Sequence, residues 1–181
     1  MPEAFAMIRG GEPQPHEGAV EEELRSWEEL LREGKAFIMR LVTFMDFKKV
    51  LERCFGSGAC VIFLEVGREC GRRSCRRLQH RYSDVRSLLD ALRDAKRGEK
   101  WGDFRFHLDL GKGTGTVAVY DGFEAREYGP STSPVCFFTR GFLEGFLSEA
   151  FGKPLKVVET KCIAQGHGFC EFAVSEAEEK A

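Results

Sequence analysis

Apolar residues in the first half of the chain follow mostly helical spacing. They recur every three or four positions over residues 20–33, and Gly34 ends that stretch. Residues 35–44 form a continuous apolar run rich in β-prone residues, which predicts a strand. Three further stretches with helical spacing follow, and they begin at Asp46, at residue 59 and at Ser83.

Strand periodicity appears after residue 103. Phe104, Phe106 and Leu108 alternate with polar residues, and a second β-prone run covers residues 116–120. The glycine-rich loop between them, residues 111–115, lacks the full spacing of a phosphate-binding loop and joins strand to strand. It therefore predicts a hairpin turn.

A last helix and a second hairpin complete the pattern. Ser133 and Pro134 are suited to the N-cap and first position of a helix that ends at Gly152. Two β-prone runs follow, over residues 157–164 and 169–174. The order α-(β)-α-α-α-β-β-α-β-β predicts an α+β fold, in which a four-stranded antiparallel sheet of two hairpins is backed by helices.

Chain length and composition limit the domain organisation. With 181 residues, the chain is long enough for one domain, expected over residues 20–175. Residues 1–19, which contain three prolines and three glycines, predict a flexible tail, and residues 176–181 a short C-terminal tail.

Charge and cysteine content exclude several classes of protein. The formal net charge of −2 argues against bulk electrostatic binding of nucleic acid. There is no apolar run long enough to span a membrane, and no secretory signal is visible. Seven cysteines without such a signal predict a reducing compartment, the cytoplasm, where thiols bind metals, catalyse or pack.

Five arginines on the helix over residues 59–80 offer two interpretations. They could contact an anion or nucleic acid, or they could form a solvated helix face paired with local acids. The overall acidity favours the second interpretation. These arginines are Arg68, Arg72, Arg73, Arg76 and Arg77.

The second hairpin carries the candidate metal ligands. If its strands pair around residues 165–168, Cys162 lies opposite Cys170, with Cβ atoms about 4.5–5.5 Å apart. Glu159 would point to the other face under strict alternation, so a site that uses all three needs a bulge or strand end near Thr160. Thiolates and carboxylates are zinc ligands, usually four in a tetrahedron.

Cys136, at the start of the last helix, is the best fourth ligand, and His167 at the loop tip is its rival. The competing interpretation is that Cys162 and Cys170 are buried small hydrophobic residues. Spacing alone leaves both open.

The remaining cysteines and histidines suggest no catalytic centre. Cys70 and Cys75 could form a second metal site or a redox pair, whereas Cys54 and Cys60 suggest packing roles. The four histidines are scattered, and no catalytic Ser/His/Asp or Cys/His pairing is apparent.

Three segments resemble the 4-vinyl reductase (4VR) domain family: GACVIFLEVGRECG (58–71), CFFTRGFLEGFL (136–147) and ETKCIAQGHGFCEF (159–172). The resemblance covers roughly residues 35–175. This family is similar to the sensory domains of phenol- and xylene-responsive transcription activators and, in fold, to TRAPP vesicle-tethering subunits. It therefore implies a TRAPP-like ligand-binding fold.

The resemblance also implies a ligand set. In the sensory relatives a zinc is held by a cysteine that starts a helix, by Glu-x-x-Cys, and by a second cysteine eight positions later. The matching residues here are Cys136, Glu159, Cys162 and Cys170. A zinc closed by four protein ligands is structural, because no position is left for a catalytic water. Those regulators append an ATPase and a DNA-binding domain that this sequence does not contain.

The first functional hypothesis is a stand-alone, zinc-stabilised domain that senses or carries a small hydrophobic or aromatic ligand. Several of the sixteen phenylalanines could line its pocket, although an ordinary aromatic core is the competing interpretation. The candidates are Phe63, Phe104, Phe106, Phe138, Phe142 and Phe146.

Two alternatives come from the family resemblance. One is an enzyme or accessory protein of tetrapyrrole vinyl reduction, which would need a partner reductase because no nucleotide or flavin motif is present. The other is a dimeric scaffold subunit. The resemblance implies a homodimer, and a sensor would also require a separate signalling partner.

Overall fold

The computed structural model describes residues 27–177 as parts of two units, with the boundary between Phe37 and Ile38, and each unit is described by itself. In the first unit, helix α2 (Trp27–Arg32) ends just before Gly34, whose φ is 72°. The Lys35 N–H closes the turn on the Leu30 carbonyl at 2.9 Å. This matches the end of the helix predicted over residues 20–33. The predicted tail over residues 1–19 lies outside the described residues.

Three helices open the second unit: α3 (Leu41–Phe55), α4 (Ser57–Gln79) and α5 (Val85–Gly98). The strand predicted over residues 35–44 is wrong, because residues 36–40 form no strand and α3 begins at Leu41. Leu41, Met45 and Lys48 have helical spacing and turn inward, but a short apolar run does not distinguish a strand from a helix.

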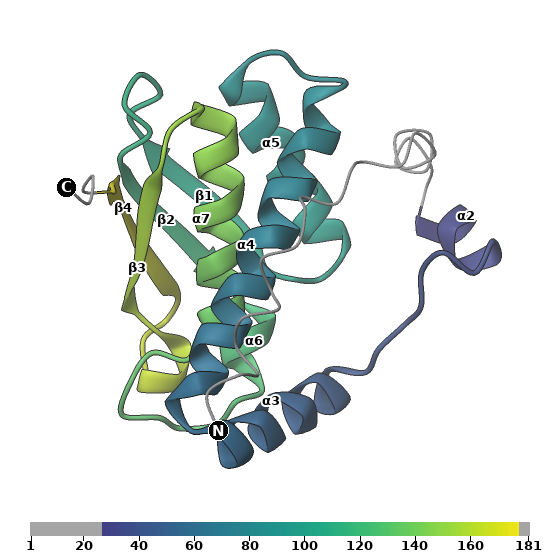
Figure 1. The fold of residues 1–181 in the computed structure, drawn as a ribbon, viewed down its shortest axis with the longest axis vertical. Helices are drawn as coiled ribbons and strands as arrows, with labels where there is room; N and C mark the ends of the chain where they lie inside the picture. Colours follow the sequence, from purple (N-terminus) through teal and green to yellow (C-terminus); the bar gives the residue numbers. More distant parts are fainter. Residues whose placement is uncertain (1–26, 178–181) are drawn as a thin grey trace, which may run out of the picture. The chain divides into compact units, whose positions relative to one another are not determined.

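The sheet has four antiparallel strands: β1 (Asp103–Leu108), β2 (Gly115–Tyr120), β3 (Leu155–Lys161) and β4 (Cys170–Glu176). Their order is β1-β2-β4-β3, so each predicted hairpin forms and the two hairpins join through β2 and β4 (Figure 1). The predicted α+β class and the four-stranded sheet are confirmed.

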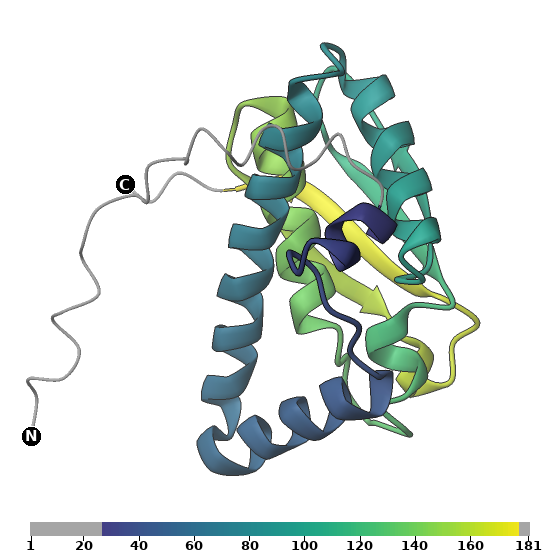
Figure 2. The same cartoon turned by 90° about the vertical axis from the view of Figure 1, so that its right-hand side faces the viewer.

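Two helices lie between the hairpins in sequence, α6 (Phe123–Arg126) and α7 (Phe137–Phe151). The short α6 was not predicted. Helix α7 begins at Phe137, with Cys136 rather than Ser133 as its N-cap residue, so the predicted start is three residues early. Helix α7 packs against the sheet on one side and α4 on the other (Figure 2).

Glycines allow α4 and α7 to pack with their backbones almost in contact. A Cβ atom added at Gly71 of α4 would lie 2.1 Å from the Phe142 carbonyl oxygen of α7. A Cβ atom at Gly145 of α7 would lie 2.1 Å from the Arg68 carbonyl oxygen of α4. Gly67 and Gly141 repeat this arrangement one turn away. The close approach gives α7 a fully buried central segment, from which the metal centre is built.

The arginines of α4 are paired locally. Arg68 bonds Glu65 and Glu144, and Arg72 bonds Glu69. The structure therefore agrees with the solvated, acid-paired helix face. Within residues 27–177, no helix combines the length and apolarity that crossing a bilayer requires.

Candidate metal centre

Three cysteines and one glutamate meet at the end of α7 nearest the β3–β4 loop. One potential ligand atom from each of Cys136, Glu159, Cys162 and Cys170 lies within 4.8 Å of all the others. The Cys136 sulfur is 4.0 Å from the Cys162 sulfur and 3.6 Å from the Cys170 sulfur. These are the four residues that the sequence predicted as ligands.

An irregularity in β3 brings Glu159 and Cys162 to the same side. The register with β4 shifts between Glu159 and Lys161, so Thr160 is an extra residue on the β3 side. Glu159 stays on the buried face of the sheet, and Cys162, just beyond the strand end, is fully buried as well. The bulge that the Glu-x-x-Cys spacing requires is therefore present.

The β3–β4 connection differs from a simple extended hairpin. Residues Ile163–Gln165 form a 3₁₀ turn, so the β-prone run predicted to reach Ala164 ends as a strand at Lys161. The Ile163 N–H points at the Cys170 sulfur, 3.3 Å away. A backbone N–H directed at sulfur stabilises a thiolate, which is the form that binds metals.

Cys136 reaches the cluster from the N-cap position of α7. Its backbone N–H donates to Glu159 Oε2 at 2.9 Å, so the two residues are fixed to one another before any metal is considered. The other carboxylate oxygen, Glu159 Oε1, is buried and has no hydrogen-bond partner in the described part of the chain. An unpaired buried carboxylate oxygen is costly, and a cation would satisfy it.

The electrostatics of the cluster also favour a cation. Burial, reinforced by the charge of Cys162, raises the pKa of Glu159 to about 8. Hydrogen bonds from Cys136 and Cys170 lower the pKa of the Cys162 thiol, and the bond to Cys162 raises the pKa of Cys136. Negative charge is thus concentrated where the four residues meet.

The donor set fits zinc. Two sulfurs bound at about 2.3 Å in a tetrahedron lie about 3.8 Å apart. The Cys136–Cys170 and Cys136–Cys162 separations bracket this value. Three thiols and one carboxylate would complete a tetrahedron, in which the metal would join α7 to the β3–β4 hairpin.

The remaining candidate ligands lie outside this cluster. His167, the predicted rival, is exposed at the tip of the β3–β4 loop. Cys75 is fully buried in the core and Cys70 half-buried, and neither belongs to a metal-binding group among the described residues. Cys54, expected to pack, is instead exposed at the end of α3, where only Met45 and Lys48 are buried.

The six phenylalanines proposed for a ligand pocket all contribute to the interior. Phe104, Phe142 and Phe146 are fully buried, and Phe138 is partly exposed. Phe138 lies in an aromatic cluster, with its ring centroid 5.6 Å from that of Trp101 and 6.3 Å from that of Phe44. Their role in ligand binding stays a prediction.

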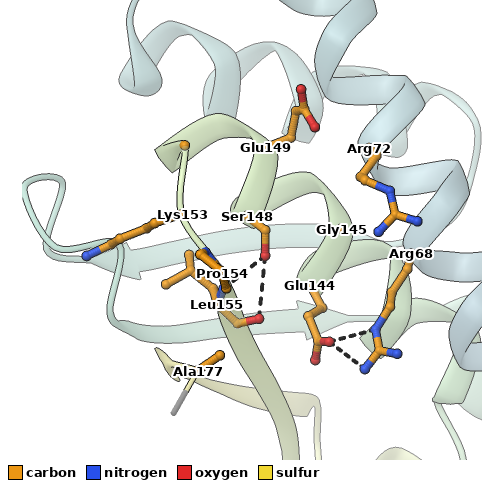
Figure 3. A pocket seen from close by; sticks show the side chains of 11 residues that line it. Arg68, Arg72, Glu144, Gly145, Ser148, Glu149, Lys153, Pro154, Leu155 and Ala177 are labelled. Atoms are coloured by element: carbon orange, nitrogen blue, oxygen red, sulfur yellow. Dashed lines mark hydrogen bonds and ion pairs between the residues drawn. The ribbon is translucent and has the colours of Figure 1, made fainter. Parts of the chain in front are cut away.

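Two clefts lie away from these phenylalanines. The larger, about 540 Å³, lies between α4, α7 and the start of β3, and both charged and apolar side chains line it (Figure 3). There Arg68 bonds Glu144, and the Ser148 hydroxyl bonds both backbone polar groups of Leu155. These bonds cover an edge of the sheet. The smaller cleft, about 380 Å³, lies beside the 3₁₀ turn at residues 163–165.

Sequence reasoning missed two residues next to the metal centre, Lys48 and Glu124. Both are completely buried, and they form an ion pair. They are separated by 76 residues, and nothing in the local pattern indicates their pairing. The only available signal was a lysine at a core position of α3, between Phe44 and Leu51.

Comparison with known proteins gives the same family. Residues 116–176, which contain all four candidate ligands, match the model of the 4-vinyl reductase domain. An uncharacterized protein of Methanocaldococcus jannaschii is 24% identical over 147 residues, which are 81% of this chain and 81% of that protein. The family resemblance drawn from the sequence is confirmed.

Solved structures share the fold. The phenol-responsive sensory domain of the transcription activator PoxR, solved with phenol, superposes with a TM-score of 0.67 at 20% identity, over 77% of this chain and 75% of that one. A vinyl-4-reductase family protein of M. jannaschii gives 0.63 at 20% identity, over 93% and 100%. An H-NOX protein from S. oneidensis gives 0.53 at 14% identity, over 84% and 88%.

Proposed function

We propose that this chain is a zinc-stabilised domain that binds a small hydrophobic or aromatic molecule as a sensor or carrier. The observation that carries the proposal is the buried group of three thiols and one carboxylate, with an unpaired oxygen on Glu159, inside a segment that matches the 4-vinyl reductase domain. Four protein ligands would close the coordination sphere, so the zinc would be structural.

The nature of the ligand is supported by the fold relationship. The PoxR sensory domain was solved with phenol, and its fold matches this one. Here the interior around Phe138 is rich in aromatic rings, which suit an aromatic guest. Phe44 of α3 covers Phe138 and Phe123 from outside, and α3 buries only two of its residues. A modest shift of α3 would therefore open a path to these rings.

Metal content tests the first part of the proposal. Plasma mass spectrometry on untagged protein should find one zinc per chain. The metal should be lost or much reduced in Cys162→Ser and retained in Cys54→Ser, which changes an exposed cysteine outside the cluster. Protein purified without chelator and free of metal would contradict the zinc site.

Ligand binding tests the second part. Trp101 is 5.6 Å from Phe138 and 5.3 Å from Phe142, so a guest near these rings should alter its fluorescence. Trp27→Phe leaves Trp101 as the single tryptophan. Titration with phenol and larger apolar aromatics should then give a saturable change.

Calorimetry on ring-deletion variants locates the binding site. Phe138→Leu should weaken binding by about 2- to 10-fold, the worth of one aromatic contact. Phe55→Leu, at the exposed end of α3, should leave the affinity unchanged. Equal effects of the two substitutions, or no saturable binding by any aromatic probe, would refute this pocket.

The proposal includes a homodimer formed through the outer face of α3. Val42 and Val50 are 53% and 42% exposed on this face. Asp46 and Arg53 lie beside them, and neither forms an ion pair within residues 27–177. A two-fold axis next to Val50 would bring Asp46 close to Arg53 of the partner subunit, so the face is complementary in charge to a second copy of itself.

A further inference from the structure

A completely buried ion pair lies beside the metal centre. Lys48 of α3 and Glu124 of α6 are 0% and 1% exposed in their side chains. The Lys48 ammonium donates to Glu124 Oε1 and also to the carbonyl oxygen of Val135. Val135 directly precedes the candidate ligand Cys136, so one lysine connects α3 to the peptide that carries a ligand.

Glu124 in turn supplies the N-terminal cap of α7. Its Oε1 accepts from the Phe138 N–H at 3.1 Å, and its Oε2 accepts from the Thr139 N–H at 2.8 Å. The Thr139 hydroxyl adds a third bond at 2.9 Å. Cys136, the N-cap residue itself, provides no side-chain cap because its sulfur points into the cluster. The free N–H groups of the first turn are therefore satisfied from α6.

We propose that Lys48 and Glu124 are positioning residues of the metal centre. Glu124 fixes the first turn of α7, and Lys48 fixes the Val135 carbonyl while neutralising Glu124. Together they hold the Cys136 sulfur where it meets the other two. This inference rests on the proposed metal function, and it assigns to α3 and α6 a part in a site whose ligands come only from α7 and the second hairpin.

The surroundings of Lys48 agree with this role. The ammonium lies 5.1 Å from the Phe63 ring centroid, 5.5 Å from that of Tyr128 and 5.6 Å from that of Phe137, so its environment is almost wholly aromatic. Desolvating such a pair is costly, and an apolar pair of similar volume would often serve stability as well. A charged pair at this place is explained by the geometry that it imposes on the start of α7.

The test compares zinc affinity in variants that remove either charge. Competition with a chromophoric chelator should show about a tenfold or greater loss of zinc affinity in Lys48→Met and in Glu124→Gln, as for other residues that orient metal ligands. Cobalt substituted for zinc should show an altered visible absorption spectrum in both variants. Thr139→Val, which removes a single bond to Glu124, should lose affinity in the same direction but less.

Lys96→Met is the matched control. Lys96 is a second buried lysine, 5% exposed, which bonds Glu99 and lies 3.7 Å from the Trp101 ring centroid. Its loss should lower stability without changing the zinc affinity or the cobalt spectrum. If Lys48→Met and Glu124→Gln keep the wild-type affinity, or if Lys96→Met reduces it equally, the positioning role is refuted while the zinc site stands.

A metal-independent measurement separates this inference from the proposed function. In chelator-treated protein, alkylation of Cys136 followed by mass spectrometry reports how firmly the start of α7 is held. Cys136 should react faster in Lys48→Met and Thr139→Val than in wild type and Lys96→Met. Equal rates in all four proteins would overturn the inference, even if the wild-type protein bound no metal.

Discussion

The cysteines of this chain illustrate how environment decides what one residue type does. Cys136, Cys162 and Cys170 are buried but face one another and a carboxylate, so their sulfurs form a ligand set. Cys75 is equally buried but faces the apolar core. Burial, with a smaller contribution from Glu149, raises the pKa of its thiol to about 12. Sequence alone did not separate these two environments, since a lone cysteine on an apolar helix fits either one.

Cys75 should therefore be inert toward alkylation in the folded protein. Relative to a free thiol with its pKa near 9, a pKa of about 12 reduces the thiolate fraction at pH 8 about a thousandfold. The raised pKa favours folding below about pH 9, and this contribution is lost as the pH rises toward 12. Iodoacetamide labelling read by mass spectrometry should modify exposed Cys54 and spare Cys75. Labelling of both at similar rates would show that α4 opens readily.

At the scale of elements, the contact between α4 and α7 determines where Cys136 can lie. Gly71→Ala would place a Cβ atom 2.1 Å from the Phe142 carbonyl oxygen and 2.7 Å from the Phe146 nitrogen, both rigid backbone atoms. The helices would have to separate, at a cost of about 1–3 kcal/mol or more in unfolding free energy. Urea denaturation measures this change.

Gly58→Ala is the control for that substitution. Gly58 lies in the first turn of α4, and its nearest neighbour for an added Cβ atom is 3.7 Å away. There alanine should stabilise the protein by about 0.4–1 kcal/mol, through the unfolded state and helix propensity. A Gly71→Ala protein as stable as wild type would mean that α4 and α7 are not in the close contact described.

The elements that could be predicted are those whose evidence is local. The hairpins follow from alternation and glycine-rich turns, and the bulge at Thr160 follows from the odd spacing of Glu159 and Cys162. The start of α7 could not be placed from sequence, because Ser133 and Pro134 form a plausible helix start. The actual cap comes from Glu124, on a four-residue helix that has no pattern of its own.

At the scale of the whole molecule, α3 is the least integrated helix of the second unit. It buries only Met45 and Lys48, yet Lys48 ties it to the start of α7. The sequence suggested a strand here because the outward residues of α3 are also apolar, and a periodic stripe is therefore absent. An apolar outer face on a helix with few internal contacts is typical of an interface.

The charge pattern of α3 gives this interface a decisive test. If two copies pack antiparallel about Val50, Asp46→Arg and Arg53→Asp should each place like charges together and weaken the dimer. The double substitution should restore it, because the pairs re-form with exchanged signs. Analytical ultracentrifugation at micromolar concentration measures the dissociation constant of each protein.

Arg86→Asp provides the control, since Arg86 is an exposed residue of α5 and the substitution makes the same change in net charge as Arg53→Asp. It should leave the dimer intact. Restoration in the double variant is the informative result, because general destabilisation of α3 would accumulate in it rather than cancel. A wild-type protein that stays monomeric, or single variants that dimerise as wild type does, would exclude this face and leave α3 free to move as a cover over the aromatic cluster.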